Sequence, residues 1–391
     1  MDVVLATRAF APEPAAAAWR HAALASALVA SGHRVRVLTS RLPAVVAGAA
    51  ETTQAAVSRW PVLRDASGNV RGYLQYASFD VPLALRLLLG RRPDVIVVEP
   101  PPTTGVVVRV VAALRRVPYV YYAADLLSYA AAEAGLRGPA LALLRAVESW
   151  VLRGAATVLT VSDGYAERLQ ALGVPPERIV QVGTGVNTDV LRPPAHPVDD
   201  EPPTLVYAGT MSEVQGVGVL VEALGRVLPE HPGARAVFYG GGVEAEALRR
   251  RAEELAPGAI TFPGLVPLEE VAAATGRARA GLASQRPDSA YAFAFLVKPL
   301  ASTACGTPVV YAGAGPMADL VRSEHLGWAV GWDVEEVAAA VREALDRVPG
   351  AQERQRLAAW TDAHHSLRAV AGRAADAVAA AGAARRRGAA R

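Results

Sequence analysis

The chain of 391 residues contains very little lysine and very little cysteine. Lys298 is its single lysine, although lysine and arginine together number 40. Cys305 is its single cysteine, which excludes an internal disulfide framework and favours a reducing compartment, here the cytoplasm. No cysteine and histidine residues share the spacing of a metal site, and no D-x-D triplet is present. We therefore expect no tightly bound metal and no cofactor.

The chain also lacks long apolar runs and a strong charge of one sign. No window of about 18 uncharged apolar residues occurs, and the start MDVVLATRAF has no basic region of the secretory type. We therefore expect neither a spanning helix nor secretion. The formal charge of +3 suits an anionic small ligand or weak peripheral membrane contact, and it is too small to indicate nucleic-acid binding.

Short apolar runs alternate with helical patterns along the whole chain, whose residues are 52% hydrophobic and 20% charged. Because the runs are continuously apolar, they predict strands buried on both faces, as in parallel sheets. The predicted strands are 3–8, 33–40, 93–99, 118–124, 156–162, 178–184, 204–210, 234–241, 259–264, 280–284, 308–313 and 326–331; the predicted helices include 15–31, 217–229 and 244–255. The pattern indicates an α/β fold.

A stretch rich in proline and acidic residues interrupts this alternation after residue 192. The strand and helix pattern then restarts, which predicts two doubly wound, Rossmann-like domains facing a cleft, followed by a helical tail that packs back on the first domain. The predicted divisions are a first domain at 1–192, a linker at 193–203, a second domain at 204–348 and the tail at 349–391.

Lys298 precedes a predicted helix and the strand at 308–313. A helix N-terminus offers free N–H groups and partial positive charge, and a nearby ammonium group adds a point charge that can pair with a diphosphate. The alternative interpretation is an ordinary solvated lysine. Its apolar neighbours and the rarity of lysine in this chain favour the functional interpretation.

Polar residues at the ends of predicted strands are the other candidates. Asp125 follows the strand 118–124, at the sheet edge where ligands bind in parallel folds, although it can equally cap the following helix. Glu13, in the loop after the first strand, has a weaker claim. The glycines at 209 and 240–242 end strands where the backbone must approach something closely, or where the chain makes a tight turn; for 240–242 the tight turn is the favoured interpretation. No nicotinamide fingerprint, Walker loop or serine elbow is present.

Four segments stand out together in this order: AWRHAALASALVASGHRVRVLTS, VLTVSDGYAERLQALGVPPERIVQVGTGVNTDVLRP, LVYAGTMSEVQGVGVLVEAL and KPLASTACGTPVV. They resemble the family 4 retaining glycosyltransferases, in the branch of bacterial polysaccharide and natural-product transferases, and the resemblance covers nearly the whole chain. It implies the GT-B fold, in which the first domain binds the acceptor and the second binds a nucleoside diphosphate sugar. It also implies that the tail helix crosses back to the first domain.

The resemblance assigns roles to residues of the second domain. Lys298 corresponds to the lysine that contacts the donor diphosphate, and Gly209 and Thr210 lie in the loop near that group. Many family members have arginine at position 210 and lysine at position 215, where this chain has Thr210 and Gln215. Val266 corresponds to the position whose backbone recognises the nucleotide base.

The resemblance also places Ser302 and Thr303 at the start of the helix that faces the phosphates. Two glutamates that the family often carries, near the sugar and ribose hydroxyls, are replaced by Phe293 and Ala301. The N-terminal loop reads EPAAAA at 13–18 and lacks the usual Gly-Gly pair. One hypothesis is that the donor is a deoxythymidine diphosphate sugar or a deoxygenated sugar, with fewer hydroxyls to contact.

The implied activity is transfer of a sugar, with retention at the anomeric carbon, to a small-molecule or lipid-linked acceptor. Lys298 and Arg286 would stabilise charge on the leaving group, and Asp125 with Glu13 would contact the acceptor. The expected setting is bacterial natural-product or glycan biosynthesis.

Three alternatives stay open: a sugar-nucleotide 2-epimerase or hydrolase of the same fold, a non-catalytic partner of another transferase, and a membrane-surface role of residues 106–119 and the basic tail. For the last, an ordinary helix in a chain whose arginines follow a GC-rich genome is the simpler interpretation.

Overall fold

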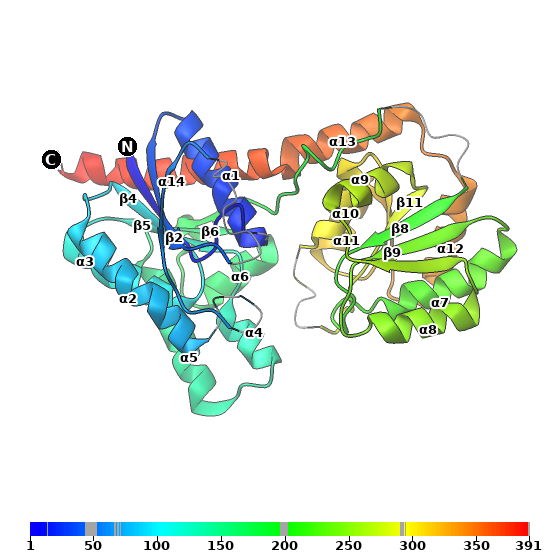
Figure 1. The fold of residues 1–391 in the computed structure, drawn as a ribbon, viewed down its shortest axis with the longest axis horizontal. Coiled ribbons are helices and arrows are strands. Elements are labelled where there is room, and N and C mark those ends of the chain that lie inside the picture. The colour runs from blue at the N-terminus through cyan, green and yellow to red at the C-terminus, as the bar shows by residue number, and fades with distance from the viewer. Residues whose placement is uncertain are drawn as a thin grey trace. The chain divides into compact units, whose positions relative to one another are not determined.

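The computed structural model describes residues 1–13, 15–43, 53–65, 68, 70, 72–195, 202–289, 293 and 295–389, with backbone only from residue 385. The chain divides into two compact units. Unit 1 comprises Met1–Gly183 and Leu367–Arg391, and unit 2 comprises Thr184–Ser366 (Figure 1).

The unit boundaries differ from the predicted ones. The first crossing falls at Gly183, before the predicted position 192, because the segment that follows is bonded to the end of unit 2. Val186 N donates to His365 O at 2.8 Å, and Thr188 Oγ1 donates to Asp362 Oδ1 at 2.7 Å. The predicted tail is likewise shared: α13 (Ala351–His365) belongs to unit 2, and only α14 (Leu367–Ala389) belongs to unit 1.

Unit 1 is built on a seven-stranded parallel sheet in the order β3-β2-β1-β4-β5-β6-β7. The strands are β1 (Asp2–Ala6), β2 (Arg34–Ser40), β3 (Ala56–Trp60), β4 (Val95–Val98), β5 (Tyr119–Ala123), β6 (Thr157–Thr160) and β7 (Ile179–Gln181). All of β4 and β5 is buried, which explains their continuously apolar sequences.

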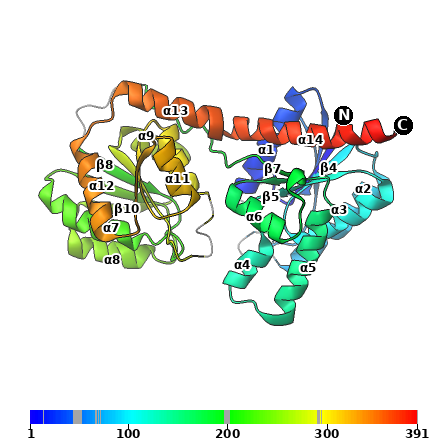
Figure 2. The same cartoon turned by 180° about the vertical axis from the view of Figure 1, so that it is seen from behind.

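Helices cover both faces of this sheet. On one face α1 (Ala16–Ala30) lies beside α14, and their apolar residues, among them Leu24 and Val378, join Val97 and Tyr122 in one core cluster. On the other face α2 (Tyr73–Leu89), α3 (Pro102–Arg115) and α5 (Gly138–Gly154) lie side by side (Figures 1 and 2). The remaining helices of unit 1 are α4 (Leu127–Glu133), α6 (Asp163–Ala171) and the short η2 (Pro176–Arg178).

Unit 2 repeats the architecture with a six-stranded parallel sheet in the order β10-β9-β8-β11-β12-β13. The strands are β8 (Thr204–Ala208), β9 (Arg235–Tyr239), β10 (Ile260–Gly264), β11 (Ala280–Ser284), β12 (Val309–Ala312) and β13 (Gly327–Val330). One face packs on α7 (Gly218–Val227), α8 (Ala245–Leu255) and α12 (Val334–Asp346), and the other on α9 (Leu268–Arg277), α10 (Val297–Ala304), α11 (Pro316–Ser323) and α13. A short η3 (Leu228–Glu230) follows α7.

Both sheets confirm the predicted α/β class with two Rossmann-like units. In each sheet the order reverses beside the first strand: between β1 and β4 in unit 1, and between β8 and β11 in unit 2. Ligands of doubly wound folds bind outside the carboxyl ends of the strands at such reversals. Those two edges are therefore where functional residues are sought. No described helix is both long enough and apolar enough to cross a bilayer.

Candidate functional site

The first site surrounds Lys298 at the carboxyl edge of β8 and β11. Helix α10 begins at Val297, so Lys298 lies in its first turn. The side chain runs over Gly209, and a Cβ atom built there would overlap Cε of Lys298. Gly209 has φ +148°, a backbone conformation that favours glycine. Nζ donates a hydrogen bond to Oε1 of Gln215 and lies 5.4 Å from the centroid of the Tyr207 ring.

Lys298 has a neutral partner and no carboxylate partner among the described residues. Burial lowers the pKa of Lys298 to about 8, because desolvation disfavours the ammonium form and no anion opposes this effect. A partly buried cation without a counter-ion is costly in the free protein. The arrangement is therefore suited to an anionic ligand, and the predicted Lys298, Gly209 and Gln215 are brought together.

The glycines of the loop after β9 support the loop after β8. Gly240 and Gly242 have φ +111° and +149°, and a Cβ atom at either would overlap the carbonyl oxygen of Gly209 or Met211. Gly209 N donates to Tyr239 O at 3.0 Å, and Met211 N donates to Gly241 O at 2.8 Å. The glycine triplet therefore seats the loop after β8, as the structural interpretation of its sequence anticipated. Thr210 is exposed at the tip of that loop.

Arg286 lies at the end of β11 in a different electrostatic setting. Its Nε and Nη2 donate to Asp288 at 3.1 and 2.9 Å, which raises the pKa of the guanidinium. The guanidinium lies 5.3 Å from the centroid of the Trp332 ring, and Trp332 Nε1 donates to Gly216 O at 3.1 Å. The adjoining cavity of about 400 Å³ has four acidic residues in its lining, Glu213, Glu222, Glu244 and Asp333. The role of Arg286 as a phosphate contact stays a prediction.

Ser302 and Thr303 were expected at the start of the helix, and this position is wrong. The helix begins at Val297, so both residues lie in its last turn. Ser302 Oγ donates to Thr307 O at 2.9 Å, and Thr303 Oγ1 lies 2.7 Å from Thr361 Oγ1. Both hydroxyls are buried and bonded within unit 2.

The other predicted donor positions present no carboxylate. Ala301 packs against an apolar cluster that includes Val186 and Leu191. Phe293 is half-buried in the segment before α10. Val266 follows β10 and packs against Tyr239 and its neighbours, which leaves its backbone in the loop at the sheet edge.

The second site is a cavity of about 430 Å³ at the carboxyl edge of β1, β4 and β5 in unit 1. The predicted Glu13 and Asp125 both line it, together with Arg8, Arg20 and Glu99. Arg8, Glu99 and Asp125 each lie within two residues after one of these strands, so the reversal of strand order brings them together.

Asp125 is not the cap of the helix that follows it. The first amides of α4 are capped by Glu148 of α5, whose Oε1 accepts from Leu127 N at 2.7 Å and whose Oε2 accepts from Ser128 N at 3.2 Å. Asp125 accepts a local hydrogen bond from Leu126 N at 2.8 Å. Much of its surface faces the cavity, yet protein atoms around the carboxyl group desolvate it and raise its pKa. Asp125 is therefore available to a ligand.

Glu13 is bound to another part of unit 1. Its two carboxylate oxygens accept from Nη1 and Nη2 of Arg64 at 3.2 and 3.4 Å. Arg64 also donates to Gly68 O and Arg41 O at 2.7 and 2.6 Å. This pair holds the loop after β1, and an acceptor contact by Glu13 stays a prediction.

Glu99 is a cavity residue that the sequence interpretation missed. It is 6% exposed and accepts from Thr7 Oγ1 at 2.5 Å and from Arg20 Nη2 at 3.4 Å. Burial opposes its ionisation, but His21, Arg20 and the Thr7 hydrogen bond outweigh burial and hold the pKa of Glu99 below its ordinary value. Burial lowers the pKa of His21, whose Nδ1 lies 2.8 Å from Ala17 O. The signal was available, since Glu99 is the last residue of the predicted strand 93–99 and Asp125 directly follows the predicted strand 118–124.

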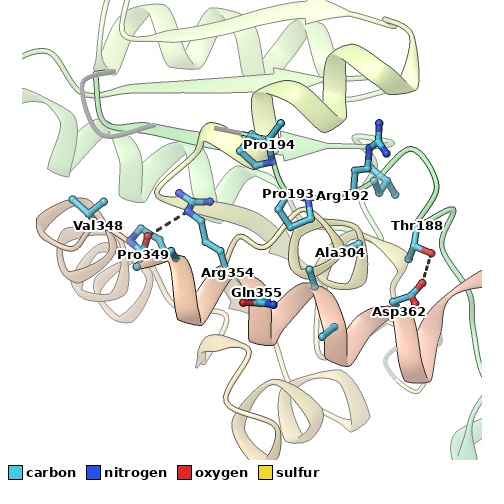
Figure 3. A pocket seen from close by; sticks show the side chains of 16 residues that line it. Thr188, Arg192, Pro193, Pro194, Ala304, Val348, Pro349, Arg354, Gln355 and Asp362 are labelled. Carbon is cyan, nitrogen blue, oxygen red and sulfur yellow. Dashed lines mark hydrogen bonds between the residues drawn. The ribbon is translucent and has the colours of Figure 1, made fainter. Parts of the chain in front are cut away.

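A further cavity of about 850 Å³ lies in unit 2 between residues 188–195 and α13, and Figure 3 shows the side chains that line it. Arg354 fixes one end, donating to Pro349 O at 3.3 Å and to Gly276 O at 2.8 Å. The hydrogen bond between Thr188 and Asp362 closes the other end (Figure 3). Its lining includes none of the predicted site residues. Among the described residues no group of three His, Cys, Asp or Glu side chains is placed to hold a metal ion.

Two Rossmann-like units in one chain, each with polar residues at its strand reversal, match the architecture of the GT-B class of fold. Two family models match the chain: a glycosyl transferase 4-like domain at residues 16–185 and glycosyl transferases group 1 at residues 202–347. The chain belongs to the GT4-type glycosyltransferases of GT-B fold, which confirms the family resemblance of the sequence.

Individual relatives agree with this assignment. Glycogen synthase of Mycobacterium tuberculosis is 29% identical over 220 residues, which are 55% of this chain and 51% of that protein. The chain thus spans about half the length of the curated relatives that it matches. Sucrose-phosphate synthase from Thermosynechococcus elongatus superposes with a TM-score of 0.73 at 18% identity, covering 98% of this chain and 100% of the other. Anabaena HepE in complex with UDP gives 0.72 at 15% identity, covering 97% and 100%. At these identities the two structures show a shared fold.

Proposed function

We propose that the protein transfers a sugar from a nucleoside diphosphate sugar to a hydroxyl group of an acceptor, with retention at the anomeric carbon. Unit 2 binds the donor and the cavity of unit 1 binds the acceptor. Membership of the GT4-type family supports the reaction class, and the UDP complex of the HepE neighbour supports the class of donor. The setting that we propose is the cytoplasm, in bacterial glycan or natural-product biosynthesis.

The observation that carries the proposal is the environment of Lys298. Its ammonium group sits at the strand reversal of unit 2, partly buried over Gly209, with the neutral Gln215 as its hydrogen-bond partner. A diphosphate supplies the counter-ion that this cation lacks, and the first turn of α10 adds N–H groups with partial positive charge. The diphosphate gains negative charge as the sugar leaves. An ammonium group fixed beside it therefore stabilises the transition state more than the ground state.

On the acceptor side, Asp125 is the residue that we propose to contact the reacting hydroxyl. It lines the unit 1 cavity and does not cap α4, because Glu148 caps that helix. Glu99 beside it is held by Arg20 and Thr7, so its role is to shape the cavity and to fix Arg20. The acceptor is a small molecule or a lipid-linked sugar.

For the donor, alanine at 301 and phenylalanine at 293 remove two carboxylates that would contact hydroxyl groups. We keep the hypothesis that a deoxythymidine diphosphate sugar or a deoxygenated sugar is preferred. A thermal-shift panel of nucleoside diphosphate sugars tests it, and clear preference for a ribonucleotide with a fully hydroxylated sugar would remove it. We propose that no bound metal or cofactor takes part, which predicts full turnover after treatment with a chelator.

The test of the reaction is the variant Lys298→Ala in the full chain. Removing one cationic contact to a leaving group costs roughly 10²–10³ in rate, so turnover should fall at least that far while the melting temperature does not drop. Unchanged turnover would defeat the assignment. Release of nucleotide and free sugar at the same rate with and without acceptor would instead favour the 2-epimerase or hydrolase class. Failure of any sugar nucleotide to bind would favour a non-catalytic partner.

A further inference from the structure

Three neighbouring helices of unit 1 expose large apolar side chains to solvent. Helices α2, α3 and α5 lie side by side on one face of the sheet (Figures 1 and 2). We define their apolar face by six residues, whose exposed fractions are 55% for Leu85, 85% for Leu89, 45% for Val110, 70% for Leu114, 67% for Leu143 and 39% for Trp150.

The spacing of these residues follows the helical repeat. Leu85 and Leu89 are four residues apart on α2, and Val110 and Leu114 are four apart on α3, so each pair lies on one side of its helix. The inward sides of the same helices are apolar too, with Leu83 and Val108 fully buried. A surface helix of a globular protein normally presents polar residues outward. Large exposed apolar side chains gathered on neighbouring helices mark an interaction site.

The charged residues of the three helices are of one sign at the surface. The acidic residues in them are Asp80 and Glu148, which are 5% and 1% exposed. Asp80 accepts a hydrogen bond from Thr104 at 2.6 Å, and Glu148 caps α4. Neither carboxylate is therefore presented to solvent.

The cations of these three helices are five arginines, Arg86, Arg109, Arg115, Arg145 and Arg153, and Arg116 follows the last residue of α3. Their described partners are carbonyl oxygens, a hydroxyl group and aromatic rings. Arg86 donates to Ser58 O at 2.6 Å, Arg115 donates to Gly90 O at 2.8 Å, and the guanidinium of Arg109 lies 4.0 Å from the Trp150 ring centroid. No carboxylate among the described residues neutralises them.

We propose that the apolar face docks on the surface of an anionic lipid bilayer. The leucines and Trp150 enter the interface, where Trp is favoured, while the arginines reach the phosphates of the lipid head groups. The positive charge of these helices favours an anionic bilayer over a second copy of the chain as the binding partner, because two copies of the same positively charged face would repel each other. This proposal departs from the sequence analysis, in which an ordinary helix at residues 106–119 was the simpler interpretation.

The test is flotation of the full chain with two kinds of vesicle, phosphatidylcholine alone and phosphatidylcholine with phosphatidylglycerol. Binding to the anionic vesicles, weakened by high salt, is expected. Arg116→Gln with Arg145→Gln should weaken it about 25-fold, since each surface arginine contributes about fivefold. Leu85→Gln with Leu114→Gln should weaken it at least about tenfold. Arg250→Gln and Leu268→Gln, exposed residues of unit 2, are the matched controls and should leave vesicle binding unchanged.

These measurements use no sugar nucleotide, so their outcome is independent of the proposed reaction. Absence of binding to anionic vesicles at low salt overturns the proposal. Binding that survives both double variants overturns it as well. A concentration-dependent dimer in sedimentation that the leucine variants abolish assigns the face to a second copy instead.

Discussion

Raising the pH from about 7 to about 9 should weaken UDP binding about tenfold, through one residue. Burial lowers the pKa of Lys298 to about 8, so most molecules carry the ammonium form at pH 7 and about a tenth carry it at pH 9. A diphosphate binds the charged form and raises the pKa of Lys298 again, so binding takes up a proton in this range. Calorimetry of UDP binding at several pH values, in two buffers of different ionisation enthalpy, measures both the affinity and the proton uptake.

The single lysine makes a direct measurement possible. Protein labelled with ¹³C-lysine gives one Cε resonance in the NMR spectrum, and its titration reports the pKa of Lys298 alone. The expected midpoint is about 8 in the free protein, and saturating UDP should move it up towards or beyond the ordinary 10.5. A free midpoint near 10.5 would show that the ammonium is solvated and would refute the burial argument. A midpoint that UDP does not move would place the phosphates elsewhere.

Two substitutions test the geometry of the separate sites. Gly209→Ala should destabilise the protein by about 2 kcal/mol and weaken UDP binding, because the backbone is left-handed there and the new Cβ displaces Lys298. Urea unfolding measures the loss of stability, with Gly218→Ala, at a position open to solvent, as the control. Equal stability of the two variants would contradict the argument. Asp125→Asn should lower kcat/KM for the acceptor about tenfold or more while UDP affinity stays the same. An equal loss of UDP affinity, measured by calorimetry, would show that Asp125 does not belong to a separate acceptor site.

The strands that the sequence predicted best are those buried on both faces. The expected strand 280–284 coincides with β11, in which every residue is buried. The elements of unit 1 that were not predicted include β3 and α2. In β3 exposed and half-buried residues alternate, so no apolar run marks it. In α2 the exposed leucines on the outer side mask the helical period, and Pro82 interrupts it.

The unit boundary shows where composition misleads. The run of prolines and acids after residue 192 is the most conspicuous break in the sequence, yet the chain leaves unit 1 at Gly183. The motif GVNTDVLRP (185–193), which ends the second segment of the family resemblance, begins just after this crossing. In the structure it is bonded to the end of α13 through Val186 and Thr188. Only tertiary contacts reveal that it belongs to unit 2.

Asp125 illustrates why the candidate site was only half predictable. A carboxylate at a strand end is equally a helix cap or a ligand contact when the sequence is considered locally. The decision comes from Glu148, which lies 21 residues beyond Leu127 and takes over the cap of α4. Its acidic side chain on an otherwise apolar and basic helix carried no local signal of that role.

Lys298 was predictable for the opposite reason, since its signal is its rarity. The structure explains why arginine, so common elsewhere, is not used at this position. The side chain crosses Gly209 where no Cβ is tolerated and ends in a small space between Gln215 and the Tyr207 ring. An ammonium group is a compact point charge with rotatable donors, whereas a planar guanidinium needs a wider space and several fixed acceptors. Lys298→Arg should therefore keep the charge and still lose UDP affinity, so this variant separates the effect of the shape of the site from the effect of its charge. An arginine variant that binds UDP as tightly as the native chain would show that any cation suffices.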